Sequence, residues 1–179
     1  YQILCATHSP LMIDISQPHS SLIRVVKNTN EETQTYQVGE NLFGRDEEAK
    51  KWVQMVNRFN PHICEAFYAD KVLLVEGDTE TIVYRDLLTR FFPDEEIFVL
   101  NTGSKMNIPF FQEILTAFHI EHYIIHDSDD KTKKAAWAIN TKIWDNIQAS
   151  NNLSKRYVHI HNFEDAHGIK VKSDDGKPL

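Results

Sequence analysis

The stretch VLLVEGDTE, Val72–Glu80, sets four apolar residues directly against two carboxylates and a glycine. A short apolar run bounded by turn-forming residues is typical of a buried strand, so we predict a strand over Lys71–Val75. Glu76 then stands at the carboxyl end of this strand, and Gly77 permits a tight exit. Glu80 follows four positions after Glu76, in the first turn of a helix. Both acids are therefore expected at one edge of the fold.

Strands and helices alternate along the remainder of the chain. The predicted strands are Lys71–Val75, Ile97–Leu100, Tyr123–His126 and Tyr157–Ile160, and the predicted helices are Thr79–Phe91, Ile108–Phe118 and Lys131–Asn151. Strands that alternate with long helices imply a parallel sheet covered on both faces. We therefore expect an α/β, Rossmann-like fold with about four parallel strands flanked by helices, and ligands at the carboxyl ends of those strands.

The first forty or so residues have a different, β-rich pattern. YQILCA reads as a strand, THSP as a turn, LMIDI as a short helix, and SLIRVVKN and TQTYQV as two further strands. An apolar stripe with helical spacing then predicts a helical connector over Arg45–Phe67.

Composition indicates ordinary globular material with one main domain. The 179 residues are 41% hydrophobic and 25% charged, with a formal net charge of -7. Such acidity argues against a broad basic surface for gripping nucleic acid, although a local basic strip or a metal-bridged contact remains open. Cys5 and Cys64 match no metal-finger spacing and favour reduced thiols in a cytoplasmic protein. Neither a leader nor a membrane span is expected. The chain begins at Tyr1, and we expect a piece of a longer protein.

Acidic residues follow the first and third predicted strands of the sheet. Glu76 and Glu80 follow the first, and Asp127 and Asp129 follow the third in the sequence IIHDSDD. At an effective dielectric near 20, each close carboxylate pair costs on the order of a few kcal/mol, so either the pKa values rise or cations bind. Hard divalent cations such as Mg²⁺ are the natural partners of such a cluster.

Two further segments would reach the same edge. HNFEDAHG follows the last strand, so Glu164 and Asp165 join the other acids if that strand lies beside the third. Two ions roughly 3.5–4 Å apart would then suit phosphodiester cleavage. NTGSK follows the second strand and offers a phosphate the backbone of Gly103 and the ammonium of Lys105.

Plainer interpretations compete with this one. Paired glutamates at a helix start are often a solvated face that favours the helix dipole, and Asp-rich turns are often capping turns. His126 fits a core or supporting position. A zinc site built from His159, His161 and His167 is disfavoured because no cysteine is near. Acids at several strand ends on one rim nevertheless favour a metal site.

KVLLVEGDTE together with IIHDSDD resembles the signature of the Toprim fold. Within that fold, Glu80, NTGSK and the late FEDAHG…GKP resemble the OLD (overcoming lysogenization defect) family of ATP-dependent endonucleases. The resemblance implies these metal ligands: Glu76, Glu80, Asp127, Asp129 and, as a further ligand, Glu164. It also implies a catalytic role for Glu76, Glu80, Asp127 and Asp129, with Lys177 as an active-site lysine for which Lys170 and Lys172 compete. Asp130 and Asp165 are supporting candidates.

The amino-terminal part supports the same family. QILCATHSPLMIDI resembles the switch-histidine segment of ABC-type ATPases, which implies that His8 senses nucleotide in the full-length protein. No G-x-x-x-x-G-K-[ST] loop occurs, so ATP would act only through a missing part of that domain and this fragment should not hydrolyse ATP. The expected domains are residues 1–44 as the end of the ATPase domain, 45–69 as a helical connector and 70–179 as the Toprim nuclease.

The resulting expectation is an Mg²⁺- or Mn²⁺-dependent DNA endonuclease that uses two ions, serves in anti-phage defence and lies in the cytoplasm. The implied partners are DNA, the protein's own ATPase domain, a second copy in a dimer or larger assembly, and an accessory defence protein, with no membrane. Two alternatives remain open: a topoisomerase or primase type of Toprim domain, and a Toprim module that assembles partners without catalysis.

Overall fold

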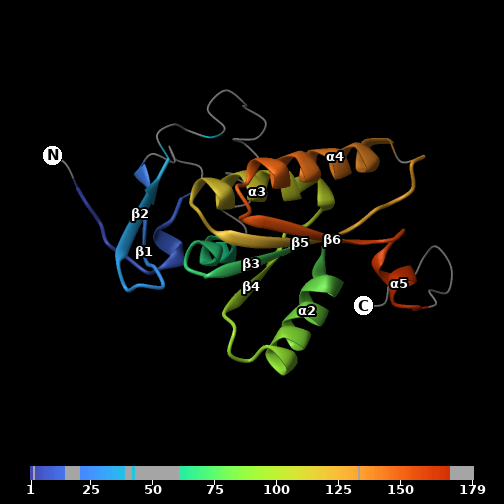
Figure 1. Cartoon of the computed structure of the whole chain (residues 1–179), viewed down its shortest axis with the longest axis horizontal. Helices are drawn as coiled ribbons and strands as arrows, with labels where there is room; N and C mark the ends of the chain where they lie inside the picture. The colour runs from blue at the N-terminus through green and yellow to red at the C-terminus, as the bar shows by residue number, and fades with distance from the viewer. Residues whose placement is uncertain (2, 15–20, 39–41, 43–60, 133, 170–179) are drawn as a thin grey trace.

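Four parallel strands form the central sheet, in the order β4-β3-β5-β6 (Figure 1). They are β3 (Lys71–Val75), β4 (Ile97–Asn101), β5 (Glu121–Asp127) and β6 (Ser154–His159). The structure is a computed structural model that describes residues 1, 3–14, 21–38, 42, 61–132 and 134–169. The sheet confirms the predicted α/β fold, and β3 has the bounds expected from its apolar run.

Helices cover both faces of this sheet. Helix α2 (Asp78–Phe91) packs on one face, while α3 (Ile108–Ala117) and α4 (Lys134–Ala149) lie together on the other (Figure 1). Two short elements follow strand ends: the 3-10 helix η4 (Lys105–Asn107) after β4 and helix α5 (Phe163–Ala166) after β6. No helix in the described part of the chain is long and apolar enough to cross a membrane.

The core lies on the two sides of β3. Val72 and Leu74 are fully buried on the side of α3 and α4, where they join a large cluster that includes Ile124. Leu73 and Val75 face α2 in a smaller cluster. Because both faces of β3 are covered, its sequence is a continuous apolar run, as parallel sheets require.

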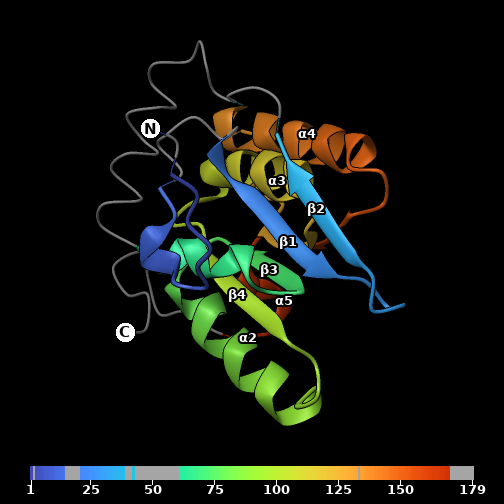
Figure 2. The ribbon, with the colours of Figure 1, turned by 90° about the vertical axis from the view of Figure 1, so that its left-hand side faces the viewer.

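A hairpin of the amino-terminal part stands at the amino end of the sheet (Figure 2). Strands β1 (Ile23–Lys27) and β2 (Thr33–Gln37) pair antiparallel, which confirms the two strands predicted there. Arg24 ties the hairpin to the α/β unit by donating to the carbonyl oxygens of Phe67, Ala69 and His119 at 3.1–3.3 Å. This single side chain satisfies carbonyl groups from two separate segments.

Some local predictions were wrong. Residue 1 and residues 3–9 form no strand, and Ile3 and Leu4 are 89% and 84% exposed, because no neighbouring strand in the described part pairs with them. The predicted helix at LMIDI is only the 3-10 helix η1 (Pro10–Met12). Of the predicted connector, residues 45–60 lie outside the described residues, as does the boundary at residue 44, and the rest contains the 3-10 helix η3 (Pro61–Phe67).

The last two strands begin earlier than predicted. β5 starts at Glu121 rather than Tyr123, and β6 starts at Ser154 rather than Tyr157. The reason is the pairing between them, which runs from His122 opposite Ser154 to Asp127 opposite His159 and so includes polar residues that an apolar pattern misses. β6 lies beside β5, which is the condition that the sequence analysis set for Glu164 and Asp165 to reach the edge of the other acids.

Candidate metal centre

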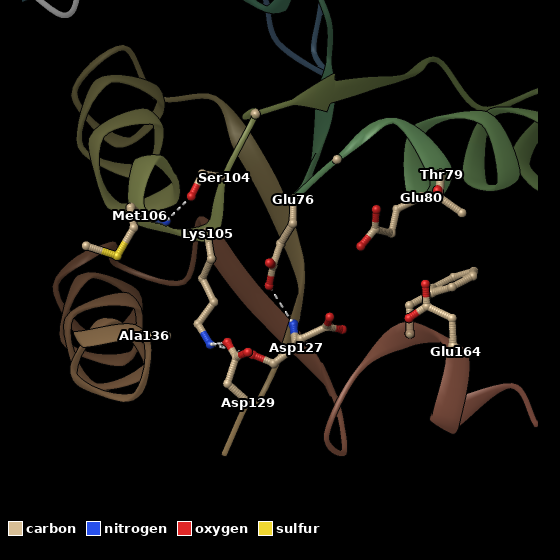
Figure 3. Close-up of a pocket in the computed structure, with 13 residues that line it drawn as sticks. Glu76, Thr79, Glu80, Ser104, Lys105, Met106, Asp127, Asp129, Ala136 and Glu164 are labelled. Carbon is tan, nitrogen blue, oxygen red and sulfur yellow. Dashed lines mark hydrogen bonds and ion pairs between the residues drawn. The ribbon is translucent and has the colours of Figure 1, made fainter. Parts of the chain in front are cut away.

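A pocket of about 360 Å³ opens at the carboxyl ends of the sheet strands (Figure 3). Its charged lining residues are Glu76, Glu80, Lys105, Asp127, Asp129 and Glu164. Asp127 is the last residue of β5, and the other five come from the segments that follow β3, β4, β5 and β6. All five predicted metal ligands therefore meet at one pocket.

Glu76 and Asp127 are joined directly. The backbone N–H of Asp127 donates to Glu76 Oε1 at 2.7 Å, because β5 lies beside β3 in the sheet. Burial raises the pKa of Glu76 to about 7, against the opposing effects of this hydrogen bond and of Lys105. Burial, followed by the nearby carboxylates Glu76 and Glu80, also raises the pKa of Asp127 to about 7. The pair carries negative charge that the protein only partly offsets.

Glu80 enters the pocket from the first turn of α2 and is 9% exposed. Gly77, the N-cap of that helix, has φ -152° and ψ -171°, which is extended backbone that other residues also adopt. The exit from β3 at Gly77 therefore does not use the conformational freedom that is special to glycine. A Cβ added at Gly77 would lie 3.4 Å from Glu80 Oε2, in ordinary contact.

Glu164 comes from α5 and lines the pocket, whereas its neighbour Asp165 does not. Asn162 caps α5 by accepting from Asp165 N at 2.8 Å, and its amide donates to Asp165 Oδ2 at 3.1 Å. Asp130 likewise lies outside the pocket lining, and its Oδ1 accepts from Thr132 N at 2.8 Å.

Lys105 and Asp129 form a buried ion pair at the other side of the pocket. Lys105 Nζ lies 2.7 Å from Asp129 Oδ2 and 2.7 Å from the carbonyl oxygen of Asp127. The side chain of Lys105 is 5% exposed and that of Asp129 is 22% exposed. Lys105 is thus the ion-pair partner of one of the acids, a contact that the sequence did not predict. Its predicted phosphate role stays a prediction.

The backbone N–H of Gly103, which the sequence offered to a phosphate, already has a partner. It has φ +72°, and its N–H donates to Asn101 Oδ1 at 2.7 Å, while the Asn101 amide donates to Asp78 Oδ1 at 2.6 Å. The turn therefore satisfies this N–H internally, although Gly103 lines the pocket. A phosphate role for Gly103 stays a prediction.

His159 contacts an acid of the pocket, and the sequence analysis did not predict this contact. Its Nδ1 lies 3.2 Å from Asp127 Oδ1 and its Nε2 lies 3.1 Å from the hydroxyl of Tyr84. The ring is 2% exposed and packs edge-on against Phe163. Burial lowers the pKa of His159, which favours the neutral ring. The β5–β6 register, which places His159 opposite Asp127, is the signal that could have found it.

The other predicted site residues lie elsewhere. His126 is buried with its Nδ1 2.9 Å from the carbonyl oxygen of Asp127, and burial lowers its pKa to about 4, in keeping with the supporting position expected for it. His8 is exposed beside Tyr68 and Ile97, at the amino end of β4 and away from the pocket. The three lysine candidates Lys170, Lys172 and Lys177 lie outside the described residues.

The donor set of the pocket suits a hydrated divalent ion. The side-chain carboxylates of Glu80 and Glu164 have no hydrogen-bond or ion-pair partner in the described part of the chain. No three His, Cys, Asp or Glu side chains among the described residues enclose an ion as they stand. Mg²⁺, however, is commonly held by one or two carboxylates, with waters and substrate phosphate completing its shell. Unneutralised carboxylates in an open pocket meet that requirement.

Comparison with known families identifies this part of the chain. Residues 67–129 match the family described as "Overcoming lysogenization defect protein-like, TOPRIM domain". The match covers about a third of the chain and includes Glu76, Glu80, Lys105, Asp127 and Asp129, but neither Glu164 nor the hairpin. No curated protein matches the chain.

The fold is therefore the Toprim fold, as predicted. Toprim domains generally bind divalent metals such as Mg²⁺, and the matched family fits the nuclease class of enzymes. Both statements agree with a carboxylate pocket at the carboxyl ends of parallel strands.

Proposed function

We propose that this chain contains the nuclease centre of an OLD-like protein and that it hydrolyses DNA phosphodiester bonds with the help of Mg²⁺ or Mn²⁺. The observation that supports this most directly is the contact between Glu76 and Asp127. The acid that follows β3 and the acid that ends β5 thereby line one pocket, which Glu80 and Glu164 also line.

Each residue then has a definable task. Glu76, Asp127 and Glu80 would hold a divalent ion, with Glu164 as a further ligand. Asp129, which pairs with Lys105, would serve a second ion. Bound ions supply positive charge that polarises the scissile phosphate and activates the attacking water. His159 keeps the Asp127 carboxylate oriented through its hydrogen bond, as outer-shell partners of metal ligands commonly do. Lys105, the only cation among the described residues that line the pocket, provides further positive charge near the phosphate.

The wider role is part of the same proposal. The full-length protein would carry an ABC-type ATPase domain that gates cleavage, with His8 near its nucleotide, and would assemble as a dimer or larger complex. We further propose a role in anti-phage defence, in the cytoplasm, with DNA as substrate and an accessory defence protein as an additional partner. These points rest on the sequence resemblance.

A plasmid-nicking assay with Mg²⁺ or Mn²⁺ tests the proposed chemistry. We expect conversion of supercoiled plasmid to open circles, and loss of that conversion in Glu76→Gln, which keeps an acceptor for Asp127 N–H. Asp86→Asn is the matched control, since Asp86 lies on the same helix α2 and pairs with Arg90 on the surface. Full activity in Glu76→Gln would contradict the proposal.

The same assay separates the alternatives. Relaxed but covalently closed circles would indicate topoisomerase chemistry, because strands are then resealed rather than hydrolysed. Intact supercoiled plasmid under all metal conditions, from folded protein, would instead indicate a Toprim module that assembles partners without cutting. Either result would refute the nuclease function.

A further inference from the structure

Lys105 is a buried cation set among the acids of the pocket. Its ammonium contacts Asp129 Oδ2 and the carbonyl oxygen of Asp127, both at 2.7 Å (Figure 3). An ammonium with a 5% exposed side chain loses most of its hydration, which is tolerated only when a counter-charge and hydrogen bonds replace the water. Asp129 supplies that counter-charge. The Asp129 carboxylate therefore already has a cation, unlike Glu80 and Glu164.

The Lys105 side of this pair is held by the turn that follows β4. Thr102 donates both its N–H and its hydroxyl to the carbonyl oxygen of Val75, at 3.0 and 2.8 Å. Asn107 donates its amide to the carbonyl oxygen of Thr102 at 2.8 Å, so it closes the turn around Lys105. The backbone that carries Lys105 is thus tied to β3.

The Asp129 side is held by backbone hydrogen bonds to the end of β6 and to the residues that follow it. Ser128 N donates to the carbonyl oxygen of His159 at 2.9 Å, and Asp129 N donates to that of His161 at 3.1 Å. Asp129 has φ +58°, an uncommon conformation for a residue other than glycine, which these bonds keep in place. Hydrogen bonds therefore fix the backbone of both partners of the ion pair.

We propose that Lys105 holds Asp129 in place of one divalent ion, so that an ion binds at Asp129 only after Lys105 has left it. This inference rests on the proposed metal-dependent function. Among the described residues, the Glu76 carboxylate accepts the N–H of Asp127 and forms no ion pair, so an ion at the Glu76–Asp127 side displaces no cation of that part of the chain. The two ions consequently bind unequally, with the Asp129 ion the weaker. The flexible stem of Lys105 lets its ammonium move to a substrate phosphate when it leaves.

Mn²⁺ titration of the full chain without DNA, followed by the electron paramagnetic resonance of free Mn²⁺, tests this order. Wild type should bind two ions with clearly different affinities. Lys105→Met removes the competing charge and nearly keeps the volume, so it should tighten the weaker ion on the order of ten- to a hundredfold. It should leave the tighter ion in place. The double variant Lys105→Met/Asp129→Asn should lose the tightened ion.

Two single variants and one control complete the experiment. Lys105→Arg keeps the cation and should keep the weaker ion weak. Asp129→Asn alone should remove the weaker ion and spare the tighter one, which keeps the test decisive if Lys105→Met does not fold. Lys71→Met is the matched control, because Lys71 pairs with Glu95 at 2.5 Å at the opposite end of β3.

Two results would overturn the inference while leaving the metal-dependent function standing. One is equal affinity for both ions in wild type, and the other is a weaker ion whose affinity does not rise in Lys105→Met. If wild type binds no Mn²⁺ at all, the inference and the proposed function fail together. The count of ions thus distinguishes the two failures.

Discussion

The backbone N–H of Asp127 donates to the carboxylate of Glu76 at 2.7 Å, across 51 positions of sequence. This bond joins the acids that end two neighbouring strands, and both acids have raised pKa values of about 7. Because they interact, their protons leave in steps that belong to the pair. The relationship has consequences for metal binding and for stability.

Metal affinity should rise with pH. Below about pH 7 the pair Glu76 and Asp127 holds protons that a divalent ion must displace, so binding weakens as pH falls. For each proton displaced, the association constant should change by up to about tenfold per pH unit. Mn²⁺ titrations between pH 5.5 and 8 measure this slope. In Glu76→Gln, Mn²⁺ binding should displace one proton fewer, so the association constant should rise less steeply with pH. An unchanged dependence on pH would show that Glu76 does not hold the proton.

The contribution of Glu76 to the stability of the metal-free protein should fall as pH rises. The folded-state pKa of Glu76 is raised from 4.5 to about 7 by burial, so between these values the folded state binds more protons than the unfolded state. The contribution of this group to stability is therefore fully present below about pH 4.5 and is lost as pH rises through 7. Urea unfolding in EDTA at pH 5 and pH 8 should show the loss.

Glu76→Gln provides the comparison for that measurement, because many other groups titrate over the same range. At pH 8 the variant should be more stable than wild type by about 1 kcal/mol, a value that allows for solvent screening of a partly exposed group. At pH 5 the difference should shrink. Saturating Mg²⁺ should stabilise wild type more than the variant at pH 8. A variant less stable than wild type at both pH values would contradict the argument.

His159 should support metal binding and activity by orienting the carboxylate of Asp127. His159→Phe keeps a ring in the space beside Phe163 but removes the hydrogen bonds to Asp127 and Tyr84. Nicking rate and Mn²⁺ affinity should both fall on the order of ten- to a hundredfold. His119→Ala, which changes an exposed ring that stacks on Tyr36, is the control and should change neither. A folded His159→Phe with wild-type Mn²⁺ affinity would exclude the positioning role.

Arg24 should hold the hairpin to the α/β unit. Arg24→Lys cannot make the fork of bonds to the carbonyl oxygens of Phe67, Ala69 and His119, so some of these groups lose their partner. We expect a loss of about 2–3 kcal/mol in the free energy of unfolding by urea. Amide exchange of β1 should also become faster than that of β3. Lys27→Met, at an exposed position of β1, should show neither effect.

Local sequence predicted much of the fold because its patterns are local. The apolar run of β3, the start of α2 within one residue of the predicted Thr79, and the alternation of strands with helices all follow from spacing within short windows. The strand predicted at YQILCA was wrong for the complementary reason: a strand needs a partner, and the apolar pattern does not say whether one exists. The early start of β6 likewise depends on pairing with β5.

By itself, the sequence determined that acids end the strands and that those ends share one edge of a parallel sheet. Only the tertiary structure decided which acids touch, because the lateral strand order depends on crossover connections that spacing along the chain does not encode. That order places β5 beside β3 and brings Asp127 to Glu76. It also brings His159 to Asp127 and Lys105 to Asp129, because the residues of each pair are distant in sequence and meet only in the folded chain.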